Sequence, residues 1–160
     1  MQGLRYCVAH TLTGRYICRR FMYHILKETK GQEYLDGWAD ITGDFDQIKG
    51  YSDLGDVFLI NSVTGEVGIL LTMENSFHPM GINEWEKFED QVLTNSKFQE
   101  DVLHKSFIKR VKEVCGVLEK EQVYIATPYP CVGGSGAPDT YKKGNVWVYL
   151  SISAQTWKQI

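Results

Sequence analysis

The sequence predicts an α+β domain in which helices pack on one face of a mainly antiparallel sheet. The first observation is a β-hairpin pattern, with apolar runs at Val57–Ile60 and Val67–Leu71 joined by a turn that contains Gly65. The second is a pair of amphipathic helical patterns after the hairpin, and the third is a return to strand-like alternation near the C-terminus. Strands that precede and follow a helix pair favour this arrangement.

Length and composition predict a single domain over residues 1–160, with a helical lead-in at residues 1–42 and an α+β core at residues 43–160. A chain of 160 residues lies in the usual single-domain range, and 43% hydrophobic with 23% charged residues is ordinary globular usage. The sequence has no internal repeat and no linker-like stretch that would divide it. One hydrophobic core is therefore expected.

The N-terminal region is predicted to be helical. Apolar residues recur at helical spacing over residues 15–30, and Gly31 supplies a C-terminal stop. A short second helix, bent near Gly37, is expected over residues 33–41. Its packed side would carry Tyr34, Leu35 and Trp38. Residues 43–56 are rich in glycine and aspartate, which predicts irregular structure.

Two helices are expected after the hairpin and a loop at residues 77–79. A helix-start pattern, in which a capping residue is followed three positions later by Glu or Gln, begins at Asn83 and again at Ser96. The second helix has one narrow apolar face and ends at Gly116. That face would carry Leu103, Phe107, Val111 and Val114.

The C-terminal region is predicted to add two strands. The first is Gln122–Ala126, and alternation over residues 145–151 predicts a second, closing strand. Val146, Val148 and Leu150 would share one face of this strand, opposite Trp147 and Tyr149. The glycine-rich loop at residues 133–136 precedes this strand, whereas a phosphate-binding loop would carry GK[ST] and open a helix. These glycines are therefore interpreted as a turn.

Charge is distributed unevenly along the chain, whose formal net charge is −3. Residues 1–30 hold six Lys or Arg against the single acidic residue Glu28, whereas residues 31–160 hold eleven basic against nineteen acidic residues. An acidic body disfavours direct binding to nucleic acid and favours the steering of a basic protein partner. A surface that is acidic only for solubility remains the alternative.

No residue pattern specifies catalysis, a metal site or a cofactor. The four histidines are far apart and lie outside any HExxH motif, the four cysteines form no CxxC pair, and GxSxG is absent. The aspartates of residues 43–56 do not fit an EF-hand, because Lys49 stands where that loop requires glycine. Without a signal peptide or an apolar run of about 20 residues, we expect a cytoplasmic protein with no membrane partner.

Three motifs are similar to those of a known family. They are LGD ahead of an apolar strand at residues 54–59, VGGS at residues 132–135 and LSISAQ at residues 150–155. In this order around a helix pair, they resemble the C-terminal domain of the immunity protein family that protects bacteria against a type VI secreted DNase effector. The resemblance covers residues 40–157. Longer family members carry an additional N-terminal domain, where this chain has about forty residues.

The resemblance implies a non-enzymatic cytoplasmic protein, without a cofactor, that binds and neutralises a protein toxin such as a nuclease. An acidic surface would mimic the phosphate backbone and dock against the basic cleft of the toxin. Charge and expected exposure, rather than the family motifs, predict the contact residues. They are Asp44, Asp46, Asp53, Asp56, Asp139 and Tyr141.

An enzyme, which would need a cluster of titratable side chains in a cleft, is one alternative function. A binding module for a small ligand, or a homo-oligomeric accessory module, is the other. It is motivated by four tryptophans in 160 residues, although core packing explains most such aromatic residues. The pocket of such a module would be lined by Trp85, Trp147, Tyr149 and Trp157. A homodimer is compatible with either function.

Overall fold

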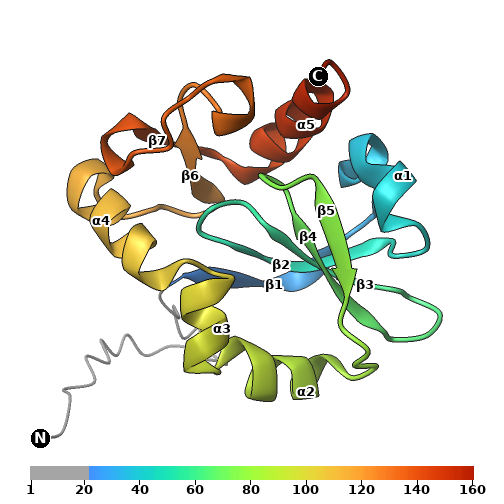
Figure 1. Ribbon diagram of the computed structural model, residues 1–160. Helices are drawn as coiled ribbons and strands as arrows, with labels where there is room; N and C mark the ends of the chain where they lie inside the picture. The colour runs from blue at the N-terminus through green and yellow to red at the C-terminus, as the bar shows by residue number, and fades with distance from the viewer. Residues whose placement is uncertain (1–21) are drawn as a thin grey trace, which may run out of the picture.

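The structure, a computed structural model, describes residues 22–160 and builds them around a five-stranded antiparallel sheet (Figure 1). Neighbouring strands follow chain order from β1 to β5, and a second sheet pairs β6 with β7. The strands are β1 (Tyr23–Lys30), β2 (Gln47–Ser52), β3 (Val57–Ile60), β4 (Val67–Leu71), β5 (Ser76–Pro79), β6 (Gln122–Ala126) and β7 (Tyr141–Asn145). The predicted hairpin is confirmed as β3 and β4, with Ile60 opposite Val67.

In residues 22–160, five α-helices and several helical turns surround the sheets. The α-helices are α1 (Ala39–Thr42), α2 (Trp85–Phe88), α3 (Ser96–Asp101), α4 (Lys105–Cys115) and α5 (Val146–Trp157). The turns are η1 (Gln32–Tyr34), η2 (Asp36–Trp38), the π-helical η3 (Glu89–Leu93), η4 (Pro130–Val132) and η5 (Pro138–Thr140). Within residues 22–160, no helix is long and apolar enough to cross a membrane.

Helices pack on both faces of the main sheet, because successive side chains of a strand point to opposite faces. Phe58 packs in the cluster that includes α2, α3 and α4, whereas Val57 and Leu59 pack with Leu150 of α5. Figure 1 shows α2 and α3 on one side of the sheet and α5 on the other. The predicted α+β class with an antiparallel sheet is confirmed, and the helices cover two faces where one was expected.

The predicted helix over residues 15–30 is wrong for its second half, where β1 runs along the edge of the sheet. Its first residues lie outside the described part of the chain. Ile25 packs toward one hydrophobic cluster and Leu26 toward the other, so apolar residues occupy both faces of the strand. The sequence therefore lacks the alternation of apolar and polar residues that indicates a strand. The segment expected to be irregular contains β2, in which Gly50 is buried against the carbonyl of His24.

The helix pair differs from the predicted pair at its boundaries. Glu84, rather than Asn83, precedes α2, and no side chain caps that helix. Asn95 caps α3 by accepting a hydrogen bond from the amide of Phe98 at 3.0 Å. The expected second helix is divided into α3 and α4 at His104, whose φ of 54° is left-handed. Gly116 ends α4 as predicted, and the residues expected to form a loop at 77–79 belong to β5.

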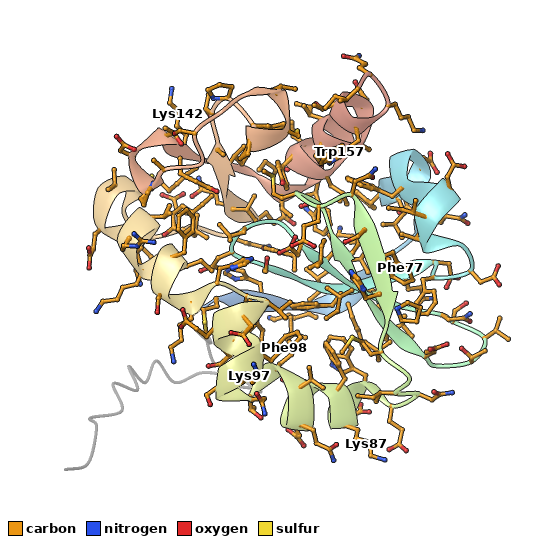
Figure 2. All side chains as sticks on the ribbon, in the orientation of Figure 1. Phe77, Lys87, Lys97, Phe98, Lys142 and Trp157 are labelled. Atoms are coloured by element: carbon orange, nitrogen blue, oxygen red, sulfur yellow. The ribbon has the colours of Figure 1, made fainter. Side chains whose placement is uncertain are left out.

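The predicted closing strand at residues 145–151 is wrong, because these residues begin α5. Asn145 caps the helix by accepting hydrogen bonds from the amides of Trp147 at 2.9 Å and Val148 at 3.2 Å. The buried residues follow helical spacing and are Val146, Tyr149, Leu150, Ser153 and Ala154. Trp157 lies on the side of α5 that faces the sheet (Figure 2) and donates a hydrogen bond to the carbonyl of Thr72. The other predicted strand is confirmed as β6.

Candidate partner-binding surface

Two of the predicted contact residues, Asp44 and Asp46, lie together. They line an open hollow of about 390 Å³ between the start of β2 and the turn that joins β3 to β4. The other lining residues are Gln32, Gly43, Asn61, Ser62, Val63 and Thr64. This lining is polar and contains no aromatic ring, so it suits hydrogen bonds and ionic contacts better than the apolar body of a small ligand.

Asp46 also holds the hairpin turn in place. Its carboxylate accepts hydrogen bonds from the Ser62 hydroxyl at 2.7 Å and from the Ser62 amide at 2.9 Å. The hydroxyl bond is the main reason why the pKa of Asp46 lies below its ordinary value, against a smaller opposing effect of burial. Asp46 is therefore ionised and fixed, and the neighbouring Asp44 is exposed to solvent.

Along the chain, this pair ends a longer acidic segment, residues 31–46, which runs from η1 through α1 to the start of β2. The segment contains five acidic residues and no Lys or Arg. They are Glu33, Asp36, Asp40, Asp44 and Asp46, of which the first four are exposed. The first three were missed in the sequence, although the absence of any cation between Lys30 and Lys49 was a usable signal.

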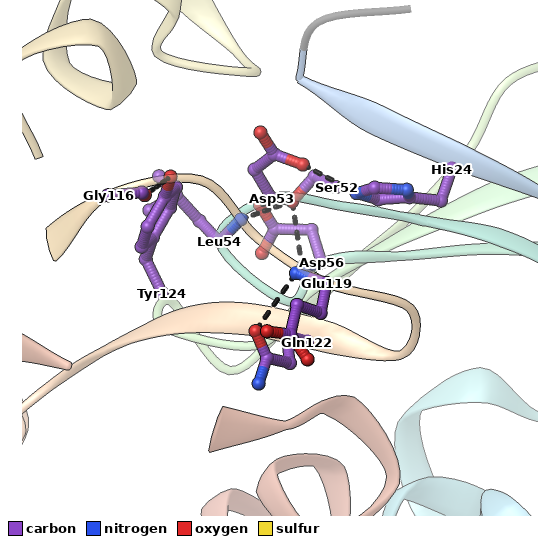
Figure 3. Close-up of polar contacts among 9 residues, drawn as sticks. All are labelled: His24, Ser52, Asp53, Leu54, Asp56, Gly116, Glu119, Gln122 and Tyr124. Atoms are coloured by element: carbon purple, nitrogen blue, oxygen red, sulfur yellow. Dashed lines mark hydrogen bonds and ion pairs between the residues drawn. The ribbon is translucent and has the colours of Figure 1, made fainter. Parts of the chain in front are cut away.

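Asp53 lies at the opposite end of β2 from Asp46, about 20 Å away along an extended strand. Its carboxylate pairs with Nε2 of His24 at 2.7 Å (Figure 3). Its amide donates to the carbonyl of Met22, and its carbonyl accepts from the amide of Tyr124. Asp53 thus joins β1, β2 and β6, and it does not belong to the surface formed by the acidic segment.

Asp56 is only 6% exposed, so the expectation that its side chain lies on the surface is wrong. Its carboxylate accepts hydrogen bonds from the Ser52 hydroxyl at 3.2 Å and the Thr72 amide at 3.0 Å. Burial raises the pKa of Asp56 to about 6, although these hydrogen bonds oppose the shift. Asp56 is buried because of the turn that precedes it. In that turn Gly55 has a φ of 87° and packs so closely on Tyr149 that a Cβ would clash.

Asp139 and Tyr141 lie around η5 and the start of β7, a part of the molecule that Figure 1 shows well apart from α1. Asp139 is exposed. Tyr141 is half-buried, with its ring 5.3 Å from that of Phe107, and burial raises the pKa of its hydroxyl. The six predicted residues therefore do not form one surface, and only Asp44 and Asp46 share a site.

The aromatic residues predicted to line a ligand pocket do not meet in one place. Trp85 is buried in the cluster beneath α2, on the face of the sheet opposite the cluster that contains Trp147 and Trp157. Trp157 lines a hollow of about 130 Å³ with Trp38. Within residues 22–160, no group of three or more His, Cys, Asp or Glu is placed to hold a metal ion.

Comparisons with known proteins identify the fold. No protein-family model matches the chain, and no curated protein sequence matches it. The structure is similar to the crystal structure of Atu4351 from Agrobacterium tumefaciens, with a TM-score of 0.63 and 14% sequence identity. The match covers 86% of this chain and 68% of that chain. At this identity the similarity shows a shared α+β fold.

Proposed function

We propose that this chain is a non-enzymatic protein that binds and neutralises a toxin with a basic surface, such as a nuclease. The observation that carries the proposal is the acidic segment, in which five carboxylates follow one another without an intervening cation. A surface of this kind attracts a basic cleft and accelerates association. A cytoplasmic location belongs to the same proposal, since the protein has to bind the nuclease in the compartment where the nuclease cleaves DNA.

The acidic segment is anchored, which favours binding. Leu35 and Trp38, which alternate with the acidic residues in the sequence, are buried. Nε1 of Trp38 donates a hydrogen bond to the carbonyl of Leu150 at 2.9 Å. Asp46 is fixed by its two bonds to Ser62. Because the backbone is already ordered, little conformational entropy would be lost when a partner binds.

The three family-like motifs support the proposal through the fold. The LGD motif forms the turn that buries Asp56, and LSISAQ lies within α5, packed by Leu150 and Ala154. In the VGGS loop, Gly134 lies so close to the carbonyl of Pro128 that a Cβ would clash. These residues have structural roles, so the motifs support a shared fold and the acidic segment supports the mode of binding.

Co-expression with a toxin encoded beside this gene tests the proposal. The protein should restore growth, and the purified pair should form a complex that weakens as salt rises from about 50 mM to about 500 mM. Reversing three exposed charges of the segment, with Asp36→Lys, Asp40→Lys and Asp44→Lys together, should weaken binding by about ten-fold or more. A toxin that remains fully active beside the wild-type protein would refute the proposed function.

A second triple variant supplies a matched control. Glu84, Glu86 and Asp90 are also exposed carboxylates, but they lie directly before α2, on α2 and on η3. Reversing these three to Lys changes the net charge by the same amount as the segment variant. If both variants weaken binding equally, the effect comes from net charge and the acidic segment is not the contact surface.

A further inference from the structure

Two stretches near the C-terminus lack charged residues entirely. Residues 127–138 and residues 144–157 contain no Asp, Glu, Lys or Arg, in a chain of which 23% is charged. The structure brings the two together, because the ring of Tyr129 packs edge-on against that of Tyr149 at 5.9 Å. The loop that contains η4 therefore lies against α5 and extends an uncharged part of the molecule.

The outward side of α5 is apolar at its centre. Val148 is 56% exposed and Ile152 is 46% exposed, one helical turn apart. Ser151 and Gln155 are exposed beside them. These four residues recur at helical spacing and form one stripe, here named the uncharged face.

The outward side of α4 carries mainly charged residues, with Val114 exposed among them. Its exposed residues include Lys105, Lys109, Arg110 and Glu113. Exposed positions on a solvated helix normally carry such charges, whereas a continuous apolar patch with a polar border indicates an interaction site. The uncharged face resembles an interaction site in this respect, because its exposed apolar residues have polar neighbours.

The acidic segment borders the uncharged face. Both η1 and η2 pack along α5, with the ring of Tyr34 5.0 Å from that of Trp147 and Gly37 against Ala154. Glu33 and Asp36 are the exposed residues of these turns. Nearby cations include Lys30, whose Nζ lies 5.8 Å from the Trp147 ring, and Lys158 after α5. The adjoining strand β7 adds the exposed Lys142 and Lys143 at the start of the helix. Asp40 lines a hollow together with Ala154 and Trp157 of α5, so the border formed by η1, η2 and α1 carries the carboxylates of Glu33, Asp36 and Asp40.

We propose that the uncharged face is the apolar centre of a protein interface whose acidic rim is the acidic segment. Its occupant is a basic protein that presents an apolar patch, namely the toxin, so this inference rests on the proposed function. Stable interfaces commonly combine a desolvated apolar centre with a polar rim, and the centre supplies most of the binding energy. A second copy of this chain fits less well, because pairing α5 with α5 would bring two acidic segments together.

Charge insertion into the uncharged face tests the inference. Val148→Glu and Ile152→Glu should each weaken binding to the purified toxin encoded beside the gene by about ten-fold or more. Val114→Glu is the control, since Val114 is 59% exposed on α4 and the substitution is chemically the same. Isothermal titration gives the dissociation constants of the wild type and the three variants, and circular dichroism checks that each variant is folded.

The outcomes separate this inference from the proposed function. If the wild-type protein does not bind the toxin, both fall. If it binds, and Val148→Glu binds as tightly as Val114→Glu, only the role of the uncharged face is refuted. The remaining candidate occupant is a second copy of this chain, and sedimentation of the wild-type protein alone tests it. If the wild type is a dimer and Val148→Glu is a monomer, the uncharged face binds a second copy and the proposal is overturned.

Discussion

Asp56 connects three parts of the molecule through its carboxylate. It accepts hydrogen bonds from Ser52 at the end of β2 and from Thr72 after β4. The Thr72 hydroxyl in turn lies 3.0 Å from the Tyr149 hydroxyl on α5. A buried carboxylate with several donors is tolerated, but its ionised form still lacks the solvation that water would give it.

The stability of the protein should therefore depend on the ionisation of Asp56. Its pKa is about 6 in the folded protein, against an ordinary value of 3.8, so between these pH values the folded state binds more protons than the unfolded chain. The free energy of unfolding should fall as pH rises from about 4 to about 6, by on the order of 3 kcal/mol from this group.

Urea unfolding of wild type and Asp56→Asn at several pH values measures this effect. The difference in the free energy of unfolding between the two proteins should change over that pH range, since asparagine does not ionise. Asp139→Asn, which removes an exposed carboxylate, should follow the wild type. A pH dependence that is unchanged in Asp56→Asn would contradict the explanation.

At the scale of elements, α5 depends on the cap at its first turn. The Asn145 side chain accepts hydrogen bonds from two backbone amides that have no partner within the helix. The same helix packs Leu150 and Ala154 into the cluster that contains Trp38 of the acidic segment. The start of α5 therefore supports both the uncharged face and the packing of the acidic segment.

Asn145→Ala should lower the free energy of unfolding by about 1 kcal/mol, because two amides lose their acceptor. Asn83→Ala is the control, since Asn83 resembles a capping residue in the sequence but caps no helix in the structure. Urea unfolding at pH 7 compares the two variants. Equal destabilisation by both would show that the capping bonds of Asn145 contribute little.

At the scale of the whole molecule, the two sheets are joined by backbone and side-chain contacts. The amide of Tyr124 in β6 donates to the carbonyl of Asp53 after β2, and the Tyr149 hydroxyl of α5 lies 3.0 Å from the Thr72 hydroxyl after β4. On the far side of α5, Trp157 donates to Thr72. These bonds connect the C-terminal residues to the main sheet at several places, which favours a single cooperative unit.

Unfolding should accordingly be two-state. Tryptophan fluorescence reports on both faces of the sheet, since Trp85 and Trp38 belong to different clusters, and far-ultraviolet circular dichroism reports on the helices. The two signals should give the same urea midpoint. Midpoints that differ would show that the residues after α4 unfold separately from the sheet.

The sequence by itself determined the α+β class, the β3–β4 hairpin, strand β6 and the end of α4 at Gly116. In these elements a local signal, such as a turn glycine or a one-sided apolar pattern, agrees with the final packing. It also placed Asp44 and Asp46 close together, because they are two residues apart on an exposed turn.

Only the tertiary structure decided β1, α5 and the burial of Asp56. In the first half of β1, apolar residues pack on both faces of the strand, so an apolar pattern consistent with a helix formed a strand. In α5 the exposed Val148 completed a false alternation with Val146 and Leu150, and the residue that misled the prediction is the centre of the uncharged face. Periodicity reveals an element only when its buried side is apolar and its outer side is polar, whereas packing decides which side is buried.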